Sequence, residues 1–147
     1  MRPVYASNTH LPDLNAQTGA FVSQLCFGKP DQIERFCSMA VFHGDQMVAG
    51  TLYHNWQPDS GVIELTSAST DRRWLTKPVV RAMFHMAFDM IGAQLVALRV
   101  SERNTGMVAI AQRFGFQGVL IPRLRGRDEA EWLFTLTDDD WRASRWS

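Results

Sequence analysis

Two segments of this 147-residue chain bring together side chains that could do chemistry. The first begins at Glu64, continues through a Ser/Thr-rich run, and leads into the basic segment Asp71–Pro78. This pattern predicts a strand, a basic loop and a helix N-terminus, where free backbone N–H groups and the helix dipole favour a bound anion. The alternative is an ordinary strand–helix turn with solvated arginines, which the local sequence alone favours.

The second segment is Val100–Gly106, which follows an apolar run typical of a buried strand. Ligands in open α/β sheets bind outside the carboxyl ends of strands, so Ser101 and Glu102 are candidates to contact a substrate or to order a water molecule. Asn104 is a favoured helix N-cap residue, and this structural role is compatible with a binding role.

Hydrophobic periodicity predicts the elements that must position these residues. A helix is expected over 11–27, ended by Gly28, with a short helical turn over 31–36. An antiparallel meander should follow, with strands over 39–41, 47–53 and 62–70.

The second half of the chain changes period. An amphipathic helix is expected over 80–91, ended by Gly92, and then a buried strand over 95–100. Because a strand, a helix and a strand follow one another, the two strands should run parallel through a right-handed crossover. The remaining expected elements are a helix over 104–114, strands over 116–121 and 132–136, and a basic turn over 122–128. This order predicts an α+β, or mixed α/β, fold.

Composition excludes several classes of protein. Hydrophobic residues make up 46% of the chain, which suits one globular domain over 1–147. The 15 basic and 15 acidic residues cancel, which argues against nucleic-acid binding through bulk charge. No apolar run could cross a membrane, the N-terminus lacks a signal-peptide pattern, and the two cysteines lack metal-binding spacing. We therefore expect a cytoplasmic protein with no metal, no nucleic-acid partner and no membrane association.

A family resemblance rests on the segment Arg99–Asn104 and on Gly115-Phe116, which follows eleven residues after Asn104. A strand, an Asn-initiated helix and a Gly-Phe pair that leads into the next strand resemble the second half of the GNAT acyl-CoA N-acyltransferase core. The stretch 50–92 is similar to the first half. The resemblance is strongest to the branch that includes ribosomal-protein N-terminal acetyltransferases.

The resemblance implies a GNAT-like fold, with a central, mostly antiparallel sheet, one parallel βαβ splay and flanking helices. Residues 36–138 would form the core, 1–35 the variable N-terminal helical region and 139–147 a tail. Acetyl-CoA would bind in the splay between the strand that ends at Thr70 and the strand that ends near Ser101. The cofactor-binding residues implied in this way are Ala68, Ser69, Thr70, Arg72, Arg73, Thr76, Lys77 and Asn104.

The resemblance also implies direct attack of a primary amine on the thioester carbonyl. Glu64 would take the amine proton, directly or through water. Ser101 is the second catalytic candidate, because it could contact the acceptor or order a water molecule. The alternative for Glu64 is a solvated or arginine-paired carboxylate.

The sequence departs from the family pattern at two places. Thr76 and Pro78 stand where the pyrophosphate loop normally has glycine or alanine, and Pro78 has no N–H to donate. Ala111 stands where many members have a tyrosine that protonates the leaving thiolate.

Several aromatic and basic residues have two interpretations. Tyr53, His54 and Trp56 could wall the acceptor groove, although core or surface positions are the commoner outcome, and His85 is interpreted as structural. Trp141 and Trp146 in the polar tail favour packing within the chain or contact in a homodimer. The Arg123–Arg127 turn could grip an acidic acceptor or a CoA phosphate, or could be a solvated hairpin tip.

The leading hypothesis is an acetyl-CoA-dependent N-acetyltransferase acting on a protein N-terminus, a lysine or a small-molecule amine. A catalytically weak or inactive GNAT-fold interaction module is the main alternative, because of the altered loop and the missing tyrosine. A nucleic-acid factor acting through local arginines is disfavoured by the neutral charge.

Overall fold

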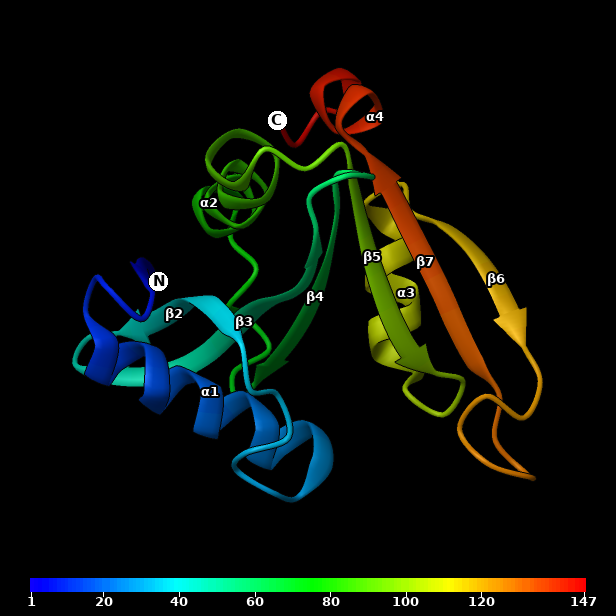
Figure 1. The fold of residues 1–147 in the computed structure, drawn as a ribbon, viewed down its shortest axis with the longest axis horizontal. Helices are drawn as coiled ribbons and strands as arrows, with labels where there is room; N and C mark the ends of the chain where they lie inside the picture. The colour runs from blue at the N-terminus through cyan, green and yellow to red at the C-terminus, as the bar shows by residue number, and fades with distance from the viewer.

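A computed structural model describes residues 1–147 and contains one seven-stranded sheet in the order β1-β2-β3-β4-β5-β7-β6 (Figure 1). All neighbouring strands run antiparallel except β4 and β5. The strands are β1 (Arg2–Ala6), β2 (Phe36–His43), β3 (Gln46–Gln57), β4 (Val62–Ser69), β5 (Leu95–Ser101), β6 (Gln117–Ile121) and β7 (Glu131–Thr137). The predicted fold class, a mostly antiparallel sheet with one parallel pair, is confirmed.

The parallel pair separates soon after it forms. β4 and β5 pair only where Val62, Ile63 and Glu64 face Leu95, Val96 and Ala97. Beyond these residues the two strands diverge toward their carboxyl ends, and Figure 1 shows the opening between them. The sheet therefore consists of two halves, β1–β4 and β5–β7–β6, that are joined by a short paired segment.

Helix α1 (Pro12–Phe27) packs on one face of the sheet against β2, β3 and β4. The packing is close at Gly50, where an added Cβ would lie 2.7 Å from Thr18 Cγ2 and 2.9 Å from Val22 Cγ2. In the register of β3 with β4, Gly50 faces Ala68 and His54 faces Glu64. Because side chains alternate between the faces of a strand, Glu64, Thr66 and Ala68 point to the α1 side.

The opposite face carries the main hydrophobic core. Helix α2 (Lys77–His85) continues as a π-helical turn over Met86–Ile91 and ends at Gly92, which has a left-handed conformation with φ 86°. Helix α3 (Thr105–Arg113) follows β5. Leu65 and Leu98 belong to the same core cluster as apolar residues of these helices. Helices α2 and α3 therefore cover β4 and β5 on the face opposite α1, and the opening between the strands is accessible from the α1 side.

The chain differs from the sequence prediction at both ends. The region 1–35, expected to be helical, begins with strand β1, which pairs antiparallel with β2. The turn of helix expected over 31–36 does not form, and Phe36 already begins β2. β1 has only five residues, too few for a clear alternating pattern, and pairing with β2 determines its conformation.

The tail contains a short helix, α4 (Asp138–Ala143), that sequence analysis missed. Thr137 caps it, and three aspartates occupy its first turn, where the helix dipole favours negative charge. Trp141 is buried against Phe84, with ring centroids 4.5 Å apart, and Trp146 packs edge-on against Phe114 at 4.9 Å. The tail tryptophans therefore pack within the chain. None of the helices combines the length and the apolar character needed to cross a bilayer.

Candidate functional site

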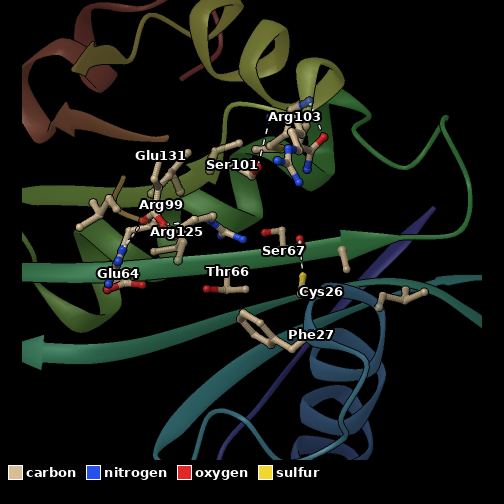
Figure 2. Close-up of a pocket in the computed structure, with 18 of the residues that line it drawn as sticks. Cys26, Phe27, Glu64, Thr66, Ser67, Arg99, Ser101, Arg103, Arg125 and Glu131 are labelled. Carbon is tan, nitrogen blue, oxygen red and sulfur yellow. Dashed lines mark hydrogen bonds and ion pairs between the residues drawn. The ribbon is translucent and has the colours of Figure 1, made fainter. Parts of the chain in front are cut away.

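A cleft of about 930 Å³ lies in the opening between β4 and β5 (Figure 2). Its walls come from the end of α1, the second halves of β4 and β5, the start of α3 and the β6–β7 loop. Among the residues that sequence analysis predicted for the site, five line this cleft: Glu64, Ala68, Ser69, Ser101 and Asn104.

One wall of the cleft is an open strand edge. Residues Leu65–Ser69 of β4 pair with β3 on one side, but no residue of β5 pairs with them on the other. Backbone N–H and C=O groups on such an edge can bind an extended chain as an added strand.

Glu64 lies at the point where the strands separate, and its side chain is 18% exposed. Asn55 Nδ2 donates a long hydrogen bond of 3.5 Å to Glu64 Oε1, and His54 Nε2 lies 3.7 Å from Oε2. His54 Nε2 also hydrogen-bonds Thr66 Oγ1 at 2.8 Å. Burial lowers the pKa of His54, against the opposing effect of Glu64, so the imidazole is neutral at pH 7. The Glu64 carboxylate thus lines the cleft with only weak contacts to its neighbours.

Ser101 and Asn104 already have structural partners. The Ser101 hydroxyl donates to Glu129 Oε2, and its oxygen accepts a hydrogen bond of 3.1 Å from the backbone N–H of Arg103. Asn104 Oδ1 accepts from the N–H of Met107 at 3.2 Å and so caps α3. The N-cap role of Asn104 is confirmed, whereas a direct catalytic role for Ser101 stays a prediction.

The cleft also holds an ionic cluster that sequence analysis did not identify. Glu131, with a side chain only 3% exposed, accepts hydrogen bonds from two arginines. Arg99 Nε donates to Oε1, and Arg125 Nε donates to Oε2 at 2.9 Å. The hydrogen bond to Glu131 raises the pKa of the Arg99 guanidinium. Both arginines line the cleft (Figure 2).

The sequence contained a partial signal for this cluster. Arg99 interrupts an otherwise apolar strand, and the Arg123–Arg127 turn is a candidate anion-binding segment. Within that turn the arginines differ: Arg125 turns toward Glu131 in the cleft, whereas Arg127 is exposed and does not line the cleft. Arg99 and Glu131 are 32 residues apart, so only the β5–β7 register brings them together.

The basic loop 71–78 does not line the cleft. Arg73 folds onto Asp71 through Nη2–Oδ2 at 2.9 Å and Nε–Oδ1 at 3.1 Å, which lowers the pKa of Asp71 to about 2. Thr76 caps α2 by accepting from the N–H of Val79 at 3.4 Å. Thr70, Arg72 and Lys77 are exposed to solvent. The five predicted cofactor residues in 70–77 are thus not brought into the cleft, and their role stays a prediction.

The positions of two other candidates, Tyr53 and Trp56, decide between the alternatives left open. Tyr53 is a core residue, 2% exposed, whose hydroxyl donates to the Met83 carbonyl at 2.7 Å, so the groove-wall interpretation is wrong. Trp56 is exposed and does not line the cleft. Ala111 is buried beside a small apolar cavity of about 30 Å³ on the core side of the splay. No group of three or more His, Cys, Asp or Glu side chains could hold a metal ion.

Comparison with known proteins gives matches only at the level of structure. No family model matches the sequence, and no curated protein matches it. A probable acetyltransferase of the GNAT family from Chromobacterium violaceum superposes with a TM-score of 0.60 at 25% identity, covering 73% of this chain and 61% of that one. Mutant forms of the spermidine/spermine N-acetyltransferase SpeG from Vibrio cholerae superpose with a TM-score of 0.74 at 7% identity, covering 97% and 98%.

The shares covered differ among the similar structures. This chain spans less than two thirds of the C. violaceum protein, and 64% to 66% of three other similar acetyltransferase structures. It spans nearly all of SpeG. What these structures have in common with this chain is the overall fold. The chain thus has the fold of the GNAT acetyltransferases.

Proposed function

We propose that this protein is an acetyl-CoA-dependent N-acetyltransferase that moves an acetyl group to a primary amine by direct attack. The observation that carries the proposal is the cleft between β4 and β5, which combines an unpaired strand edge with a carboxylate at its closed end. The edge suits an extended donor chain, and Glu64 lies where the two strands meet.

In this mechanism the amine nitrogen attacks the thioester carbonyl carbon. The C–N bond forms, the C–S bond breaks, and CoA leaves as a thiolate, which then takes up a proton from solvent. Glu64 accepts the proton that the nitrogen loses, directly or through a water molecule. The cleft contributes mainly by positioning the two reactants. Because a thiolate is a stable leaving group, the reaction does not need a tyrosine at position 111.

The donor would be held mainly by β4 and the loop after it. The backbone of Ala68, Ser69 and Thr70 would pair with the pantetheine arm, and Asn104 would approach it from the opposite wall. Arg72, Arg73, Thr76 and Lys77 would contact the pyrophosphate, which requires Arg73 to leave Asp71. The acceptor amine would belong to a protein N-terminus, a lysine side chain or a small molecule, and the similarity to SpeG adds a polyamine to these candidates. We also propose a cytoplasmic homodimer.

A second candidate, a GNAT-fold interaction module with little or no activity, is favoured by one specific observation. The loop that should bind pyrophosphate has Pro78 without an N–H, and its Arg73 is engaged by Asp71. Both features would weaken the hold on CoA phosphates.

A thermal-shift titration with acetyl-CoA separates the two candidates. A donor at 100 times its dissociation constant should stabilise the protein by about 2.7 kcal/mol. Release of free thiol in the presence of an amine panel then measures transfer. No shift at millimolar acetyl-CoA would refute the enzyme, and a shift without thiol release on any amine would favour the module.

A further inference from the structure

We propose that the acceptor is an amine that carries a carboxylate a few bonds away, as in an amino acid, and that Arg99 and Arg125 bind this carboxylate. The inference rests on the proposed function and names the class of acceptor for the same cleft. It depends on the ionic cluster around Glu131, on the charge of the cleft and on the place of Glu64.

Glu131 fixes both arginines while leaving most of their donors free. Each guanidinium has five N–H donors, and each of these two uses Nε alone for its hydrogen bond to Glu131. The Nη groups of Arg99 and Arg125 have no hydrogen-bond acceptor within the protein. Because the buried carboxylate of Glu131 already orders both arginine side chains, they lose little further conformational entropy when an anion binds.

The charge of the cleft also favours an anion. Its lining includes three arginines, Arg99, Arg103 and Arg125, and only two carboxylates, Glu64 and Glu131. Arg103 is paired with Glu129 outside the lining, at 3.2 Å. Arg99 and Arg125 share one hydrogen-bonded carboxylate, Glu131, and Glu64 at the closed end supplies the other negative charge of the lining. A bound carboxylate would accept from the free Nη donors through charge-assisted hydrogen bonds, whereas a polyamine would place further positive charge beside the two arginines.

The position of Arg99 indicates that the bound anion belongs to the acceptor and not to the donor. Glu64 pairs in register with Ala97, and Arg99 lies two residues further along the same face of β5, about 7 Å along the strand. The hydrogen bond to Glu131 raises the pKa of the Arg99 guanidinium, and the negative charge of Glu64 adds to this effect. In CoA the phosphates lie at the opposite end of the pantetheine arm from the thioester. An anion beside the proposed base therefore belongs to the amine.

The test compares matched acceptors on wild-type protein and on Arg99→Gln. The acceptors are glycine, β-alanine, γ-aminobutyrate and glutamate, each paired with its amide, together with spermidine. We expect kcat/KM to be at least 10-fold higher for the preferred acid than for its amide. Arg99→Gln should lower kcat/KM for the acid by about 10- to 100-fold and leave the amide little changed. Arg127→Gln, in the same loop as Arg125 but exposed, is the matched control and should behave as wild type.

Two further measurements keep the test decisive. Arg99→Lys retains the charge next to Glu131 but loses the planar fork, so it should fold normally and show part of the same loss for acids. Calorimetric binding of the acids and amides without acetyl-CoA gives a readout that does not need transfer. Equal use of acids and amides, a preference for spermidine, or an equal loss for acid and amide in Arg99→Gln would overturn the inference while the proposed function stands. Acid binding that Arg99→Gln abolishes, without any transfer, would support the anion site and refute the enzyme.

Discussion

The two groups of basic residues around the splay are built differently. Arg99 and Arg125 are held by a buried carboxylate, Glu131, and their free donors face the cleft. Arg73 and Lys77 lie on an exposed loop, and Arg73 is paired with Asp71, its neighbour two residues away. A buried counter-ion fixes a guanidinium with respect to the fold, whereas an exposed local one only competes with a ligand. In the proposed mechanism the acceptor side is therefore preorganised, whereas the loop assigned to the donor would have to rearrange to bind phosphate.

The largest expected effect tests the carboxylate at the closed end of the cleft. Glu64→Gln should lower kcat by about 10²- to 10⁴-fold, because an amide cannot accept the amine proton. Affinity for acetyl-CoA, measured by thermal shift, should stay within about twofold of wild type. Unchanged turnover would remove Glu64 from the mechanism, and a matching loss of donor affinity would show that it acts by binding.

The second prediction concerns the counter-ion itself. Glu131→Leu should lower the free energy of unfolding by about 1–3 kcal/mol, because it leaves Arg99 and Arg125 without their acceptor. Urea denaturation measures the effect, and Glu131→Gln, which keeps one acceptor oxygen, should lose less. Equal stability of wild type and Glu131→Leu would mean that the cluster does not fix these arginines, and the contrast with the loop would disappear.

The third prediction addresses the loop. Arg73→Ala combined with Lys77→Ala should weaken acetyl-CoA binding by about 2- to 10-fold, a modest loss because both side chains are exposed. Arg113→Ala combined with Arg127→Ala also removes two exposed positive charges and serves as the charge-matched control. If the double variant binds the donor as wild type does, the phosphates are held elsewhere and the loop assignment is refuted.

The smallest effect has the opposite sign. Asp71→Asn should tighten acetyl-CoA binding by about 2- to 5-fold, since it releases Arg73 from its internal partner. Titration calorimetry at low and high salt should show that the gain shrinks as ionic strength rises. Weaker binding in this variant would indicate that Asp71 holds the loop in its binding conformation instead of competing with the ligand.

Local signals account for the elements that sequence analysis predicted well. Gly92 and Asn104 mark helix boundaries through the conformation or hydrogen bond of a single residue, and the strand–helix–strand order around them implies the parallel pair. Ser101 was predicted because it ends an apolar strand, whereas the role predicted for Glu64 follows from the family resemblance. Such features depend on neighbours in the chain and can be recognised without any knowledge of tertiary contacts.

The cluster at Glu131 could not be predicted in the same way. Its three members are separated by up to 32 residues, and they meet only because β7 inserts between β5 and β6. The ion pair between Arg73 and Asp71 is hard to predict for a different reason. The same positive charges can bind an anion or pair with a carboxylate of their own loop, and the sequence pattern is the same in both cases.

The two halves of the sheet are connected directly by three residue pairs, Val62–Leu95, Ile63–Val96 and Glu64–Ala97. This segment is the only strand pairing between the two halves, and the cleft opens beyond it. An extended donor bound along Leu65–Ser69 would lie between the two halves of the sheet and restrict their movement relative to each other. Occupancy of the cleft would then be visible far from the reacting atoms, as slower amide hydrogen exchange along both β4 and β5.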